Sequence, residues 1–223
     1  MEDGVLGLGE TGHTGIMPGM ELVVRAARPE DPAARLLYVS AAPYYDQYAG
    51  GEARARRLLD SVYPHRQHTA SWEVCHVAVI DGAVAGVLAA FPVAEGELLA
   101  RRFIRLTLGR IPPWRLPGLI RHLRASSAVS PQPPAGVLYV DALAVDPAWR
   151  RRGVARALLA EADRIAAVRN LRGVALDTGI ENRAARALYQ RSGFEQRGLR
   201  PVPDERSARA IGGSGFVGYV KRR

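Results

Sequence analysis

Residues 150–156, RRRGVAR, carry the clearest chemical signal in the chain. They follow an apolar run at 137–145, which predicts a buried strand, and they precede apolar residues at helical spacing, which predict a helix. The backbone N–H groups at the start of that helix stand free at the positive end of its dipole, among arginine side chains. Such a site binds phosphate. The candidate residues are Arg150, Arg151, Arg152, Gly153, Val154, Ala155 and Arg156.

Two carboxylates sit in otherwise apolar strands. Asp141 is the only charged residue in its predicted strand, and Asp177 ends the apolar run VALDT. Partial burial raises the pKa of a carboxyl group towards the range of a useful general base. Each can instead be a hydrogen-bonded carboxylate at a strand end. Glu73 and His76 are weaker candidates for the base.

The elements that must position these groups follow from the hydrophobic pattern. Residues 1–20 lack apolar periodicity, and we expect a flexible leader; its GxGxxG has neither a strand before it nor a helix after it. Residues 95–135 predict a basic helical insertion between the third and fourth strands. The expected strands cover 21–27, 72–80, 83–91, 137–145, 173–178, a segment opening at 193 and 216–220; the expected helices cover 30–40, 52–62, 154–169 and 182–191.

Composition favours one soluble domain over residues 21–223. The net charge is +9, but the cations are arginines apart from Lys221 and form no clustered tail, so nucleic acid is a weak explanation. Arginine in place of lysine indicates a bacterial source. A single cysteine, Cys75, fits a reducing cytoplasm, and no apolar run reaches the roughly 20 residues of a membrane span. His65 and His68 lack further ligands, so we expect no metal.

Two motifs together carry a family resemblance. The first is the Q/R-x-x-G-x-G/A loop, present at residues 150–155, and the second is N-x-x-A-x-x-L-Y-x-x-x-G-F. The second motif is formed by Asn182, Ala185, Leu188, Tyr189, Gly193 and Phe194. In these motifs the chain resembles the GCN5-related N-acetyltransferases, the GNAT superfamily, over about residues 21–223. The resemblance implies an α/β fold with a central mixed, mostly antiparallel sheet, splayed fourth and fifth strands, and flanking helices.

The resemblance also implies roles for residues. Acetyl-CoA is the expected co-substrate, with its pyrophosphate on the 150–156 loop and its pantetheine along the edge formed by Leu143, Ala144 and Val145. Asn182 is the expected N-cap of a helix, within reach of the cofactor together with Ala185. Tyr189 lies seven residues later on the same helix face. In the family this tyrosine is the general acid that protonates the departing thiolate.

The implied function is N-acetyl transfer from acetyl-CoA to a primary amine in a ternary complex, with Asp141, Asp177 or a chain of water molecules taking the proton. The alternative is a catalytically degenerate domain that binds acyl-CoA as a sensor or interaction module. The acceptor is not readable from the sequence. Tyr44, Tyr45 and Tyr48 either line an acceptor pocket or pack a helix, and the 95–135 insertion either builds the acceptor wall or forms a contact in a homodimer.

Overall fold

The computed structural model describes residues 13–17, 20–130 and 132–223. Among them, eight strands form one sheet in the order β1-β2-β3-β4-β5-β6-β8-β7. The strands are β1 (His13–Met17), β2 (Met20–Ala26), β3 (Cys75–Ile80), β4 (Ala83–Pro92), β5 (Leu138–Val145), β6 (Gly173–Gly179), β7 (Glu195–Pro201) and β8 (Gly215–Arg222). Every neighbouring pair is antiparallel except β5 and β6, which are parallel. This mixed, mostly antiparallel sheet confirms the expected fold class.

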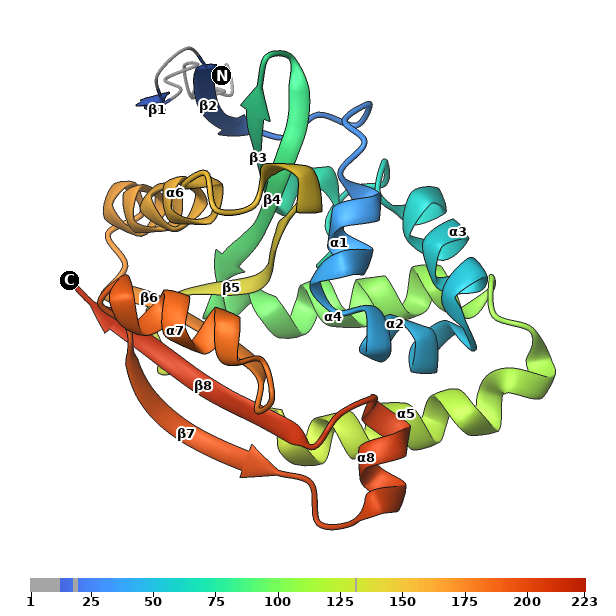
Figure 1. Ribbon diagram of the computed structural model, residues 1–223. Helices are drawn as coiled ribbons and strands as arrows, with labels where there is room; N and C mark the ends of the chain where they lie inside the picture. Colours follow the sequence, from blue (N-terminus) through green and yellow to red (C-terminus); the bar gives the residue numbers. More distant parts are fainter. Residues whose placement is uncertain (1–12, 18–19, 131) are drawn as a thin grey trace, which may run out of the picture.

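Helices cover both faces of the sheet (Figure 1). One layer consists of α1 (Ala34–Ser40), α2 (Ala42–Ala49), α3 (Glu52–Val62), α4 (Val93–Leu108) and α5 (Leu116–Val129), with α8 (Glu205–Ile211) packed on α5. The other layer consists of α6 (Val154–Val168) and α7 (Arg183–Arg191). Each layer encloses its own apolar cluster, which buries Leu36 and Leu59 on the first side and Leu158 and Ala162 on the second.

Local sequence signals account for the edges of several elements. The β3–β4 hairpin turns at Asp81 and Gly82, with φ values of 48° and 80°, the left-handed pair that a two-residue turn needs. Helix α7 begins after Asn182, whose side chain accepts a 3.1 Å hydrogen bond from the amide of Ala185. The predicted N-cap is therefore confirmed as a cap.

Four segments differ from expectation. Residues 13–17, which we expected in the flexible leader, form strand β1 against β2; this pairing covers an edge that β2 would otherwise leave open. The rest of that leader and its GxGxxG lie outside the described residues, apart from Met20, which begins β2. Helices α2 and α8 were not predicted, because their short sequences show little apolar periodicity. Residues 72–74 form a 3-10 turn rather than the start of β3.

The 95–135 insertion contains the two long helices α4 and α5, between β4 and β5. With β1 counted, the strands on either side are the fourth and fifth in the chain. The insertion packs against α2 of the same chain. The hydroxyl groups of Tyr48 on α2 and Thr107 on α4 lie 2.5 Å apart and share a hydrogen bond. His122 on α5 is buried and stacks edge-on against Tyr44.

Candidate active site

The sheet opens into a fork between β5 and β6. The two parallel strands pair only from Leu138 to Val140 and from Val174 to Leu176, although both continue beyond these residues. On its other side β5 stays paired with β4 as far as Val145. Within the described chain, the edge of β5 from residue 141 to 145 and the facing edge of β6 from residue 177 to 179 therefore lack a strand partner. This is the splay expected from the sequence.

Asp141 marks the point where β5 leaves β6. It is the extra residue of a β-bulge, because Val140 pairs with Ala90 and Ala142 pairs with the adjacent Ala89. The bulge reverses the faces of the strand. Leu138 and Val140 pack in the cluster under α6, and after the bulge the residues at 142 and 144 pack in the cluster under α1 to α3.

The environment of Asp141 raises its pKa. The residue keeps surface open to water, but protein atoms fill most of the space around the carboxylate and weaken its hydration. This desolvation, with a smaller contribution from the negative charge of Asp177, raises the pKa of Asp141 to about 7. The charge of Asp141 in turn adds to the rise that burial causes in the pKa of Tyr44 and Tyr45 on α2. Helix α2 thus lies beside the carboxylate.

Asp177 occupies the matching position on β6, one residue after the last pair with β5. Its Oδ2 accepts a 2.5 Å hydrogen bond from the hydroxyl of Tyr139. Burial raises the pKa of Asp177 to about 6, and the hydrogen bond from Tyr139 offsets part of that rise. Two carboxyl groups with raised pKa values therefore lie at the apex of the fork, Asp141 on β5 and Asp177 on β6.

The arginine-glycine loop lies at the start of α6. Arg151 and Gly153 have φ values of 63° and 79°, so the loop alternates into the left-handed region, where glycine is favoured. A Cβ at Gly153 would project into open space, with no atom of the described residues within 4 Å. The backbone amides of Gly153, Val154 and Ala155 have no hydrogen-bond acceptor among the described residues. The loop presents these donors to whatever binds there, at the positive end of the helix dipole.

Ion pairs and side-chain hydrogen bonds hold this loop against the rest of the sheet. Asp146 accepts a 3.0 Å hydrogen bond from the amide of Ala148 and a 2.5 Å ion-pair contact from Arg35 on α1. The Nε of Arg150 donates to the carbonyl of Val145 at 3.3 Å. This last contact occupies one carbonyl at the outer end of the β5 edge and leaves the edge nearer Asp141 open.

Tyr189 is buried on the inner face of α7. Its ring packs against Phe194 and, edge-on, against Tyr219 at 5.7 Å between centroids. Burial is the main cause that raises its pKa, and the nearby charge of Asp177 adds to the effect, so the phenol stays protonated at neutral pH. Its hydroxyl makes no hydrogen bond with any residue in the described part of the chain. The donor is therefore available on the α7 side of the fork.

The remaining candidates separate into near and distant groups. Tyr44 and Tyr45 lie near Asp141, whereas Tyr48 packs in the core and shares its hydroxyl with Thr107. Glu73 and His76 have partners of their own, whereas Cys75 lies in the core within reach of the charge of Asp141. Glu73 binds Arg66 and the amide of Gln67, His76 lies 3.4 Å from Glu161 of α6, and Cys75 is a buried free thiol whose pKa is raised by burial.

In the described chain, no group of three or more His, Cys, Asp or Glu side chains is arranged to hold a metal. No described helix is long and apolar enough to cross a bilayer.

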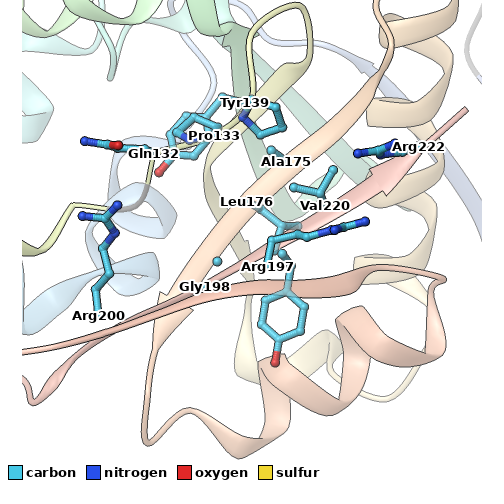
Figure 2. A pocket seen from close by; sticks show the side chains of 13 residues that line it. Gln132, Pro133, Tyr139, Ala175, Leu176, Arg197, Gly198, Arg200, Val220 and Arg222 are labelled. Carbon is cyan, nitrogen blue, oxygen red and sulfur yellow. The ribbon is translucent and has the colours of Figure 1, made fainter.

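Sequence reasoning missed two parts of this region. Tyr139 gave no signal of its own, because an aromatic residue in an apolar strand is ordinary; only its bond to Asp177 distinguishes it. The second part is a hollow of about 270 Å³ on the sheet face of β6, β8 and β7 (Figure 2). Its lining includes Tyr139, Gly198, Arg200 and Arg222.

Comparison with known proteins agrees with this architecture. A family model described as the acetyltransferase (GNAT) family matches residues 37–194. A crystal structure of an N-acetyltransferase from Staphylococcus aureus Mu50 superposes with a TM-score of 0.65 at 17% identity, over 88% of this chain and 98% of that one. A structure described only as an acetyltransferase superposes with a TM-score of 0.64, also at 17% identity, over 89% of this chain and 98% of that one.

The matched span covers most of the chain and includes the loop, both carboxylates and Tyr189, so the chain belongs to the GNAT acetyltransferase family. A curated relative, an uncharacterized protein of Mycobacterium leprae (strain TN), is 40% identical over 84 residues. That match covers 38% of this chain, and this chain spans only about a fifth (21%) of the length of that relative.

Proposed function

We propose that the protein is an N-acetyltransferase that moves the acetyl group of acetyl-CoA to a primary amine while both substrates are bound. The fork between β5 and β6 carries this proposal. It offers an unpaired strand edge for an extended ligand with amide groups, free backbone amides at one end, and two carboxyl groups with raised pKa values at its apex.

The residues present fit acetyl-CoA. The open space above Gly153 and the free amides that follow it suit a pyrophosphate, and the surrounding arginines add charge-assisted hydrogen bonds. The open edge formed by Leu143 and Ala144 suits the two amides of pantetheine, which can pair with it as an added strand does. In this proposal Asn182 and Ala185, at the start of α7, also contact acetyl-CoA.

The reaction forms a C–N bond and breaks the C–S bond of the thioester. A primary alkylamine has a pKa near 10.4, so only a small fraction is unprotonated at neutral pH, and a base must remove a proton from the attacking nitrogen. Asp141 or Asp177 takes that proton. The thiolate of CoA leaves with the bonding electron pair and receives a proton from the hydroxyl of Tyr189, which water then reprotonates. Holding both substrates together removes much of the entropic barrier.

The test combines binding with turnover. Calorimetric titration measures acetyl-CoA binding, and release of CoA thiol measures transfer to a panel of primary amines. We expect Tyr189→Phe to bind acetyl-CoA normally and to lower kcat by about 100-fold or more, because general acid catalysis contributes about 10² to 10⁴. Tyr63→Phe is the matched control, since the hydroxyl of Tyr63 is bonded to the carbonyl of Arg28 and Tyr63 follows α3, outside the strands and helices that form the fork.

Two outcomes would contradict the proposal. Full activity of Tyr189→Phe at every pH would remove Tyr189 from the role of acid. Tight binding of acetyl-CoA without transfer to any amine would instead identify the chain as an acyl-CoA-binding module.

A further inference from the structure

Three residues form one row across the sheet, beginning at the fork. Asp177 of β6 pairs with Gly218 of β8, and Gly218 pairs with Gly198 of β7. Residues paired across antiparallel strands project from the same face, and neighbouring strands lie about 4.8 Å apart. The two glycines therefore extend about 10 Å sideways from the carboxylate, on the face to which that carboxylate belongs.

The absence of side chains along this row leaves the sheet hollow. A Cβ at Gly198 would meet no atom within 4 Å in the part of the chain that the structure describes, and its backbone is not in the left-handed region. The hollow of about 270 Å³ lies over these glycines and includes Tyr139, the residue bonded to Asp177. Gln132 and Pro133, from the segment between α5 and β5, border it opposite the strands (Figure 2).

The charges around the hollow have one sign. Among the described residues, three arginines line it and no aspartate or glutamate does. Arg197 is paired with Glu195, but Arg200 and Arg222 have no acidic partner among the residues that the structure describes. In Figure 2, Arg200 lies on the left of the view, on the side of Gln132, and Arg222 lies on the right. A guanidinium group without an acidic partner favours a carboxylate or phosphate, and Arg200 is the nearer of the two to the glycine row.

These arginines are separate from the loop that suits the phosphates of CoA. Val174 packs in the cluster under α6, whereas its neighbour Ala175 lines the hollow and packs with Val220 in a different cluster. Alternate residues of a strand face opposite sides of the sheet. The hollow and helix α6 therefore lie on opposite faces, and the hollow is open to a second ligand while the loop holds the first.

Resting on the function proposed above, we propose that the hollow binds the anionic end of the acceptor. The acceptor is a small primary amine that also carries an oxyanion. Its amine lies at Asp177 and Asp141, and its carboxylate or phosphate lies over the glycine row on the side of Arg200, which is two residues beyond Gly198 on β7. The length of the row corresponds to a linker of about five or six carbons between the two groups.

The test compares acceptors of matched length. The set is 6-aminohexanoate, 5-aminopentyl phosphate, the uncharged 6-amino-1-hexanol and the dication 1,6-diaminohexane. We expect kcat/KM for the two anionic amines to exceed that of the amino alcohol by about 10-fold or more, because a hydrogen bond to a charged group is among the stronger polar contacts. The preference between carboxylate and phosphate identifies which oxyanion the hollow takes.

Two variants locate the effect. Arg200→Gln should raise KM for the anionic amines about 10-fold and leave the amino alcohol unchanged; Arg57→Gln, on the exposed face of α3, removes the same charge elsewhere. Gly198→Leu should fill the hollow and raise KM for all the long acceptors, with KM for acetyl-CoA unchanged. Gly109→Leu is its control, since Gly109 also has free space and an ordinary φ of −68°.

The outcomes separate this inference from the function on which it rests. Equal kcat/KM for the anionic amines and the amino alcohol, or a preference for the diamine, would overturn the inference and leave acetyl transfer intact. If the protein acetylates none of these four compounds and no amine of a broader panel, the acetyltransferase proposal is overturned. In that case calorimetric titration with 6-aminohexanoate tests whether the hollow binds an oxyanion, independently of catalysis. Binding that is lost in Arg200→Gln supports an oxyanion site, and absence of binding to the unmodified protein refutes it.

Discussion

The hydroxyl of Tyr139 donates a 2.5 Å hydrogen bond to Oδ2 of Asp177, and this bond joins β5 to β6 at the point where the two strands separate. It holds the carboxylate on the sheet face of the hollow and stabilises its ionised form. The same tyrosine lines the hollow. One side chain thus links a candidate base to the candidate acceptor site.

Removal of that bond should change the pH dependence of the reaction. In Tyr139→Phe the ionised form of Asp177 loses a donor, so its pKa should rise above the value of about 6. If Asp177 is the base, the acidic limb of the kcat/KM profile moves to higher pH, and activity near pH 6 falls more than activity at pH 8. A pH profile of the variant measures this shift. An unchanged acidic limb would show that Asp177 is not the group that titrates in the reaction.

The two carboxylates should differ when each is replaced. Asp141→Asn and Asp177→Asn keep the shape of the side chain but remove its basic form. We expect the variant that lacks the true base to lose about 10²-fold or more in kcat at pH 7. The other should retain most activity with a shifted profile. If Asp177→Asn is the variant that stays active, Asp141 is the base. The acidic limb of the pH profile of Asp177→Asn should then move to lower pH, because the charge of Asp177 raises the pKa of Asp141. Equal, small losses in both variants would indicate that water carries the proton.

Replacement of Gly153 should weaken binding of acetyl-CoA by more than the accompanying loss of protein stability would explain. Gly153→Val places a side chain in the open space above the free amides and forces a φ of 79° on a branched residue, which costs about 1–2 kcal/mol. We expect KM for acetyl-CoA to rise about 10-fold or more. Gly82→Val is the matched control, because Gly82 has a φ of 80° and equally free space in the β3–β4 turn. An equal rise of KM in both variants would contradict a direct role for the loop.

Asp141 should also reduce stability at alkaline pH. Its folded-state pKa of about 7 lies above the ordinary value of 3.8, so the native state binds a proton more tightly than the unfolded state does. Stability contributed by that proton is present at low pH and is lost as pH rises through about 7. Asp141→Asn should therefore raise Tm at pH 8 relative to the unmodified protein, with a smaller difference at pH 5. Thermal unfolding at both values checks this, with Asp60→Asn on the exposed face of α3 as control.

The sequence by itself determined the features that depend on neighbouring residues. The turn at Asp81 and Gly82, the cap at Asn182 and the loop before Val154 each need only a few adjacent residues to define their backbone. The other strands and helices, apart from β1, α2 and α8, and the two family motifs followed from the same local patterns. The family and the fold class could therefore be predicted from the sequence.

Tertiary structure alone decided how distant strands meet. The register of β4 makes Asp141 a bulge, the short pairing of β5 with β6 puts both carboxylates at the apex of the fork, and the row from Asp177 to Gly198 exists only because β8 lies between β6 and β7. Register is set by packing over the whole sheet, and a shift of one residue would reverse every face. For this reason the arginine-glycine loop was readable in the sequence, while the hollow beside Asp177 and the bond from Tyr139 were not.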